Sequence, residues 1–172
     1  MSIMLQAFIF GLIWSVMWSV YVFLILKFYP FSMLHDYPKD IQAAATIEEP
    51  TKAQEKAAKR FGAIGGLVIF GVLLAFGLLR FHSKQASFLQ VLKYIFIIAM
   101  TWNVVDLLVM DWLIVCTITP KWIVLRGTEG CKGYKDYLYH FKGFLIGCGY
   151  TTIMALLFSG IDYEVLHLFI WH

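Results

Sequence analysis

Residues 99–119 read AMTWNVVDLLVMDWLIVCTIT, an apolar run that contains two acids, Asp106 and Asp111. The run is long enough to cross a bilayer, since the hydrocarbon core takes about 20 helical residues to span. A carboxylate near the middle of such a helix costs roughly 2.5–3.5 kcal/mol on insertion scales. The pattern therefore predicts a membrane helix inside a bundle that needs polar groups, and the two acids are the first candidates for a functional site.

The composition of the whole chain is that of a membrane protein. Of its 172 residues, 60% are hydrophobic and 15% are charged, whereas soluble domains have about 45–50% apolar and about 25% charged residues. The net charge of +3 is too small to indicate nucleic-acid binding, and the basic residues lie beside apolar segments. Three cysteines without regular spacing argue against a disulfide framework.

Four apolar segments meet or approach the length of a membrane helix. They predict one all-α transmembrane domain over residues 1–172, a four-helix bundle with spans at about 4–26, 61–81, 91–118 and 141–159. The first segment has no basic n-region and no cleavage site, so we interpret it as an uncleaved span. The third is long, which indicates tilt or an extension beyond the bilayer, with a re-entrant segment as the alternative.

The distribution of basic residues predicts the orientation. Most of the fourteen Lys and Arg residues fall in or directly beside the first and third connections, residues 27–60 and 119–140. By the positive-inside rule, these two loops are cytosolic and both termini lie outside. We expect the protein to reside in the plasma membrane.

The connections and the C-terminal end have their own signals. Residues 51–60, TKAQEKAAKR, are strong helix formers and predict a cytosolic extension of the second span, so the first loop is expected to be a solvated helical hairpin without chemistry. The glycine-rich third loop is a surface turn or a ligand-binding loop. The apolar stretch that continues past Gly160 is too long for one crossing, so we expect a break there and a short interfacial helix capped by Asp162.

Small residues recur at four-residue spacing on the first and fourth spans, which places them on one face of each helix. Such stripes predict close packing between helices, while the alternative is that their hydroxyls contact a ligand. The stripes consist of Ala7, Gly11, Ser15 and Ser19 in the first span and of Gly143, Gly147, Thr151, Ala155 and Ser159 in the fourth.

Ideal α-helical geometry separates the two acids of the third span. At about 100° per residue, Asn103, Asp106 and Thr117 share a face, whereas Asp111 lies about 140° around from Asp106. Each acid is therefore expected to need its own partner, with Asp106 handling an ion or proton and Asp111 taking part in chemistry. The alternative is that both acids are structural and bond to neighbouring helices.

Candidate partners for Asp111 come from the third loop and the start of the fourth span. His140 follows Asp136 by one helical turn, so we expect Asp136 to orient the imidazole, and the candidate catalytic set is His140, Asp136 and Asp111. The candidate ligand-binding set is Asn103, Asp106, Asp111, Thr117, Arg126, Glu129 and Lys135. A divalent metal is a further alternative, with weak candidate ligands in Glu129, Cys131, Asp136 and His140, although no CxxC or HxxxH pair is present.

Three classes of function stay open on these residues. The first is a protein that binds or transports a cation, a proton or a small cationic ligand, as a homo-oligomer or as a subunit of a membrane complex. The second is an enzyme that acts on a lipid or prenyl-type substrate at the cytosolic leaflet, with His140 as general base and Arg126, Lys132 and Lys135 holding an anionic headgroup. The third is a structural or assembly factor.

Overall fold

The computed structural model describes residues 2–171. Within this range the chain is helical and forms no strand. Four helices are long and apolar enough to cross a membrane, the third of them continuing from α5 into η2. They are α1 (Ile3–Phe28), α4 (Lys52–Phe81), α5 (Phe88–Val105) with η2 (Asp106–Ile118), and α6 (Tyr137–Phe169). The prediction of an all-α protein with four membrane-length helices is confirmed.

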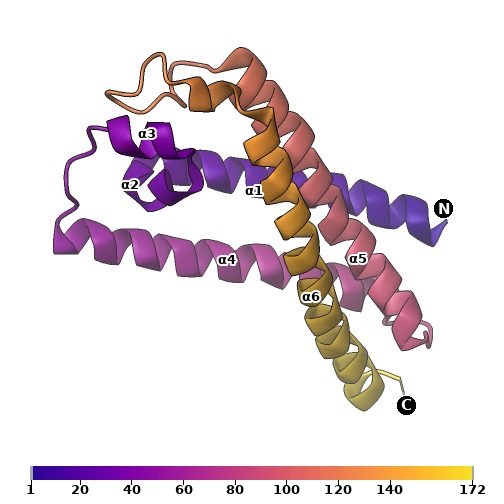
Figure 1. Ribbon diagram of the computed structural model, residues 1–172. Helices are drawn as coiled ribbons and strands as arrows, with labels where there is room; N and C mark the ends of the chain where they lie inside the picture. The colour runs from indigo at the N-terminus through magenta and orange to yellow at the C-terminus, as the bar shows by residue number, and fades with distance from the viewer. Residues whose placement is uncertain (1, 172) are drawn as a thin grey trace.

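The helices form two crossing layers. Figure 1 shows α5 with η2 running beside α6, and this pair crossing α1 and α4. α5 contacts α1 and α6 extensively and so occupies the centre of the fold. The start of α1 and the end of α6 lie away from α2 (Pro30–Met33) and α3 (Lys39–Ala44) in Figure 1. Trp171 donates from Nε1 to the carbonyl of Phe81 at 2.8 Å.

Local sequence signals explain where the helices begin. Thr51 and Gln54 form a capping box that starts α4 at Lys52, which confirms the predicted helical extension of the second span. Ser87 and Gln90 form the same arrangement at the start of α5. Each box satisfies backbone N–H groups that the first helical turn leaves without an intrahelical acceptor.

The small residues of the first span lie in a helix interface, as predicted. Ala7 and Ser15 are buried, and Gly11 lies so close to Thr101 of α5 that a Cβ would stand 2.6 Å from the Thr101 Cβ. On α6 the predicted interface holds in the second half of the stripe, where Ala155 and Ser159 are fully buried. In the first half, Gly147 also packs closely, since a Cβ there would stand 2.6 Å from Asn103 Oδ1 of α5, whereas Gly143 only lines a cavity.

The expected break at Gly160 is wrong, because α6 continues without interruption to Phe169. Asp162 does not cap an interfacial helix. It is fully buried and faces Gly77 of α4, where its carboxylate fills the space that a side chain on α4 would take. A glycine inside a helix costs only about 1 kcal/mol relative to alanine, and the packing of buried Ser159, Asp162 and Leu166 outweighs it.

The expectation that the first connection is a solvated hairpin is also wrong. It folds into α2 (Pro30–Met33), η1 (Leu34–Asp36) and α3 (Lys39–Ala44), which pack on the third connection and on η3 (Lys132–Lys135). Tyr37 donates to the carbonyl of Ile123 at 3.3 Å, and the Gly133 N–H donates to Asp40 Oδ2 at 2.8 Å. The two loops therefore make a second small core with buried Tyr37, Ile41, Ile123, Leu125 and Tyr134.

The third span changes its hydrogen-bond pattern at Asp106. From Asp106 to Ile118 it is π-helical, with i→i+5 bonds such as the one from the Thr119 N–H to the Ile114 carbonyl at 2.8 Å. π-Helical turns are rare in proteins, and those that occur are often found at functional sites. An i→i+5 pattern brings residues five positions apart to nearly the same face. The prediction that Asp106 and Asp111 point to different faces is therefore wrong.

Candidate functional site

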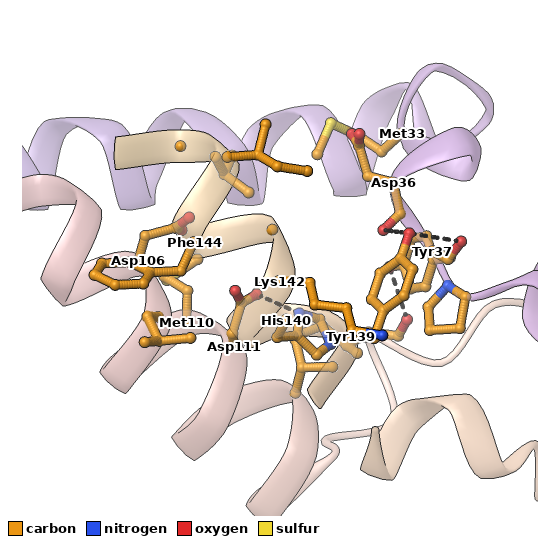
Figure 2. A pocket seen from close by; sticks show the side chains of 18 of the residues that line it. Met33, Asp36, Tyr37, Asp106, Met110, Asp111, Tyr139, His140, Lys142 and Phe144 are labelled. Atoms are coloured by element: carbon orange, nitrogen blue, oxygen red, sulfur yellow. Dashed lines mark hydrogen bonds and ion pairs between the residues drawn. The ribbon is translucent and has the colours of Figure 1, made fainter. Parts of the chain in front are cut away.

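A cavity of about 600 Å³ lies beside the π-helical segment. Its lining comes from α1, from the first turns of α6, and from α5 and η2 (Figure 2). The segment from Met33 to Ile41, in the first connection, closes one end. Most of the lining is apolar, and the polar side chains deep in the cavity are Asn103, Asp106, Asp111 and His140.

Asp111 and His140 form a direct pair in the cavity wall. Asp111 Oδ1 lies 2.9 Å from His140 Nδ1, with the two side chains 25% and 12% exposed. A carboxylate at Nδ1 fixes the proton on that nitrogen in the neutral ring and leaves Nε2 as the basic atom. Nε2 is buried and has no hydrogen-bond partner among the described residues. The arrangement is that of an oriented base, or of a stable ion pair when the ring is protonated.

Asp136 does not orient His140, so that prediction is wrong. Asp136 has a non-helical backbone and caps α6, where its Oδ1 accepts from the Tyr139 N–H at 2.9 Å. Its side chain therefore accepts from a backbone N–H in the first turn of α6 and does not pair with His140. The orienting carboxylate is Asp111, which the π-helical pattern turns toward α6.

Asp106 lies deeper along the cavity, and its surroundings are aromatic. Within residues 2–171 its carboxylate makes no ion pair or hydrogen bond. The side chain of neighbouring Asn103 donates to the Phe144 carbonyl at 3.4 Å and to Cys148 Sγ at 3.2 Å. Figure 2 shows the Asp106 carboxylate beside the ring of Phe144. Trp102, one turn before Asp106, stacks on Trp18 of α1 with ring centroids 5.5 Å apart, and both indoles line the cavity.

Four residues of the predicted ligand-binding set lie outside the cavity, and two of them, Lys135 and Thr117, have structural roles. Lys135 Nζ donates to the carbonyls of Cys116 and Thr117 at 2.6 and 3.1 Å, and so satisfies the end of η2. Thr117 Oγ1 donates to the Trp112 carbonyl at 2.7 Å. Arg126 and Glu129 are exposed in the third connection and do not line the cavity.

The first connection contributes residues that the sequence did not indicate. Asp36 and Tyr37 line the outer end of the cavity, and the Tyr139 hydroxyl donates to their carbonyls at 3.2 and 3.3 Å (Figure 2). Burial raises the pKa of the Tyr37 phenol above its ordinary value, and burial also raises the pKa of Asp36, an effect that neighbouring His35 partly opposes. The one local signal for this end was the Asp36-Tyr37-Pro38 sequence, where the proline favours a helix boundary between η1 and α3.

The candidate metal ligands are not gathered in space. Among the described residues, no group of three or more His, Cys, Asp or Glu side chains is placed to hold a metal ion. Cys131 Sγ lies 3.9 Å from the Asp40 carbonyl, and Asp136 caps α6, while His140 faces Asp111.

The cavity contains one unpaired carboxylate among aromatic rings and, next to it, an Asp–His pair. It lies among helices that are long enough to cross a membrane. The functional argument depends on this geometry, because comparison with protein-family models, curated proteins and solved structures gives no match to the chain.

Proposed function

We propose that this chain is an integral membrane protein that binds a cation, a proton or a small cationic ligand in the cavity, with Asp106 as the principal anionic group. The supporting observation is that Asp106 lines the cavity and its carboxylate has no ion pair or hydrogen bond with the described residues. An ionised carboxylate in low-dielectric surroundings costs several kcal/mol unless a charge compensates it. A bound proton or cation removes this cost, so the cavity favours positive ligands.

The neighbouring groups do not neutralise Asp106. The His140 imidazole faces Asp111 at 2.9 Å, so its positive form is compensated by that carboxylate. Lys142 lines the cavity but is an exposed residue, and it forms no ion pair with any described acid. Asp106 therefore keeps an uncompensated negative charge whenever it is ionised.

Transport is the natural extension of binding in a membrane. Four helices enclose little volume, so a complete path across the bilayer would require a second copy or a partner subunit. The proposal places both termini outside and the loops over residues 27–60 and 119–140 in the cytosol of a plasma-membrane protein, because most basic residues lie in or beside these loops. The cavity then lies at the level of the cytosolic leaflet.

The experiment that tests this function compares Asp106→Asn with Glu129→Gln, an exposed acid outside the cavity. Thermal unfolding in nanodiscs is followed with ethylammonium chloride against NaCl at equal ionic strength, and proton flux is followed in proteoliposomes. A ligand at 100 times its Kd stabilises by about 2.7 kcal/mol. We expect the response of the wild type to persist in Glu129→Gln and to be lost in Asp106→Asn. A wild type without any cation response or flux, or a response that survives Asp106→Asn, would refute the proposal.

The Asp111–His140 pair supports a second candidate, an enzyme acting on a lipid or prenyl-type substrate. His140 Nε2 would act as general base, Asp111 would hold the ring, and Lys142 would contact an anionic headgroup. The lipid composition of cells that express the wild type or His140→Ala tests this candidate. Equal composition in the two strains would reject it.

A further inference from the structure

We infer that the cation is the head of an amphiphile, an alkylammonium compound, which enters the cavity sideways from the bilayer between α1 and α6. The inference rests on the proposed function and names its ligand class. The cavity extends along α6 from Tyr139 to Gly147, which is about 12 Å at 1.5 Å per residue. One leaflet contributes about 15 Å of hydrocarbon. The cavity is thus long enough for a head and the first part of a chain.

The wall between α1 and α6 is open on the lipid side. Each of the two helices packs extensively on α5 but hardly touches the other, and both line the cavity. Ile146 lines it while 62% exposed, so the same side chain borders the cavity and the surface that lipid covers. At Gly143, also exposed and in the lining, a Cβ would meet no atom within 4 Å. The glycine therefore leaves an opening in this wall.

The head chemistry follows from what surrounds Asp106. The indoles of Trp18 and Trp102 and the ring of Phe144 line the cavity with it. Aromatic faces attract organic ammonium groups, and they do so most strongly where water is excluded. A small hard cation instead requires several oxygen ligands, and the described residues gather no group of three or more Asp, Glu, His or Cys side chains that could hold one. A carboxylate among aromatic rings is therefore suited to an ammonium head.

The apolar lining fits the rest of such a molecule. Side chains from α1, η2 and α6 form this lining, among them Val22, Leu26, Leu107, Met110, Val115 and Ile146. An alkyl chain gains about 0.8 kcal/mol for each CH2 group that leaves water. A chain that moves from the bilayer into the cavity gains less, since lipid is also apolar. Selectivity among amphiphiles with the same chain therefore has to come from the head at Asp106.

The test measures the binding of three probes to the protein in nanodiscs, by thermal shift and by titration. The probes are dodecylammonium, ethylammonium and dodecanol. Dodecylammonium is expected to bind the wild type at least tenfold more tightly than either of the others, because only it has both the charge and the chain. Asp106→Asn should lower its affinity at least tenfold, while the protein unfolds at a similar temperature without probe.

Gly143→Leu and Gly149→Leu test the side entrance. Both glycines are exposed on α6 with no atom within 4 Å of an added Cβ, but Gly149 does not line the cavity. Dodecylammonium binding should be lost in Gly143→Leu, reduced less in Gly143→Ala and unchanged in Gly149→Leu. Equal binding to Gly143→Leu and Gly149→Leu would overturn the side entrance.

The outcomes separate this inference from the proposed function. If ethylammonium binds as tightly as dodecylammonium and Asp106→Asn abolishes both, the amphiphile is excluded and the cation site stands. If dodecanol binds as tightly as dodecylammonium, the cavity is an apolar groove and the ammonium head is rejected. If no probe binds the wild type, the inference fails, and the proton flux then decides the proposed function separately.

Discussion

Replacement of Gly77 by alanine tests how α6 is seated in the bundle. A Cβ at Gly77 would overlap the Asp162 carboxylate and lie 3.1 Å from Ile95 Cδ1. Overpacking of this kind costs about 1–3 kcal/mol, and removing a glycine from a helix returns roughly 0.5–1 kcal/mol. The net expectation is a loss of about 1–2 kcal/mol, or several degrees in unfolding temperature for a chain of this size.

Gly71→Ala is the matched control, because Gly71 lies on the same helix and a Cβ there would meet no atom within 4 Å. It should be neutral or slightly stabilising. Thermal unfolding in one detergent measures both variants, together with Gly77→Ala/Asp162→Ala, in which the smaller side chain should restore part of the lost stability. If Gly77→Ala is as stable as Gly71→Ala, Asp162 does not lie against α4, and a break at Gly160 becomes the better description.

Three further predictions concern the site and its supports. Asp111→Asn and His140→Gln should each destabilise the protein by about 1–3 kcal/mol, and their effects should be less than additive in a double-mutant cycle. Additive effects would show that the 2.9 Å pair between these two side chains does not form. Lys135→Met should lower the free energy of unfolding by roughly 1 kcal/mol, because two carbonyls at the end of η2 lose their donor, whereas Arg126→Gln in the exposed loop should be neutral. Equal effects of the two substitutions would refute the capping role of Lys135. Burial raises the pKa of Tyr37 above the ordinary 10.0, so the unfolded chain loses this proton first and stability should fall as the pH rises above about 10. Stability should fall less steeply with pH in Tyr37→Phe, and an unchanged slope of stability against pH would place the phenol in solvent.

Much of the fold could be predicted from length and hydropathy, because a helix in lipid must satisfy its own backbone. The four apolar segments became α1, α4, α5 with η2, and α6. The small-residue stripe of the first span also became an interface, since close helix contact requires small side chains. At Gly160 the local rule failed, because Asp162 and its buried neighbours hold α6 straight through tertiary contacts that span more than eighty residues of sequence.

The candidate site was half predictable. Asp106, Asp111, Asn103 and His140 stand out in an apolar sequence, and all four line the cavity. Their relation was not predictable, because it depends on the π-helical pattern from Asp106 onward, and this pattern has no signature in the residues themselves. The contribution of the first connection was hidden for another reason. Its burial comes from contacts such as that between Tyr37 and Ile123, which no local pattern encodes.

The measurement that tests the central claim most directly is charge-selective modification of the cavity. Met110 lines it between the two acids and is 6% exposed, so Met110→Cys in a background without Cys116, Cys131 and Cys148 reports on access. A cationic methanethiosulfonate reagent should modify this cysteine at least tenfold faster than an anionic reagent of similar size, and Asp106→Asn should remove the preference. Equal rates for the two reagents, or a preference that survives Asp106→Asn, would contradict the claim that Asp106 makes this cavity a site for cations.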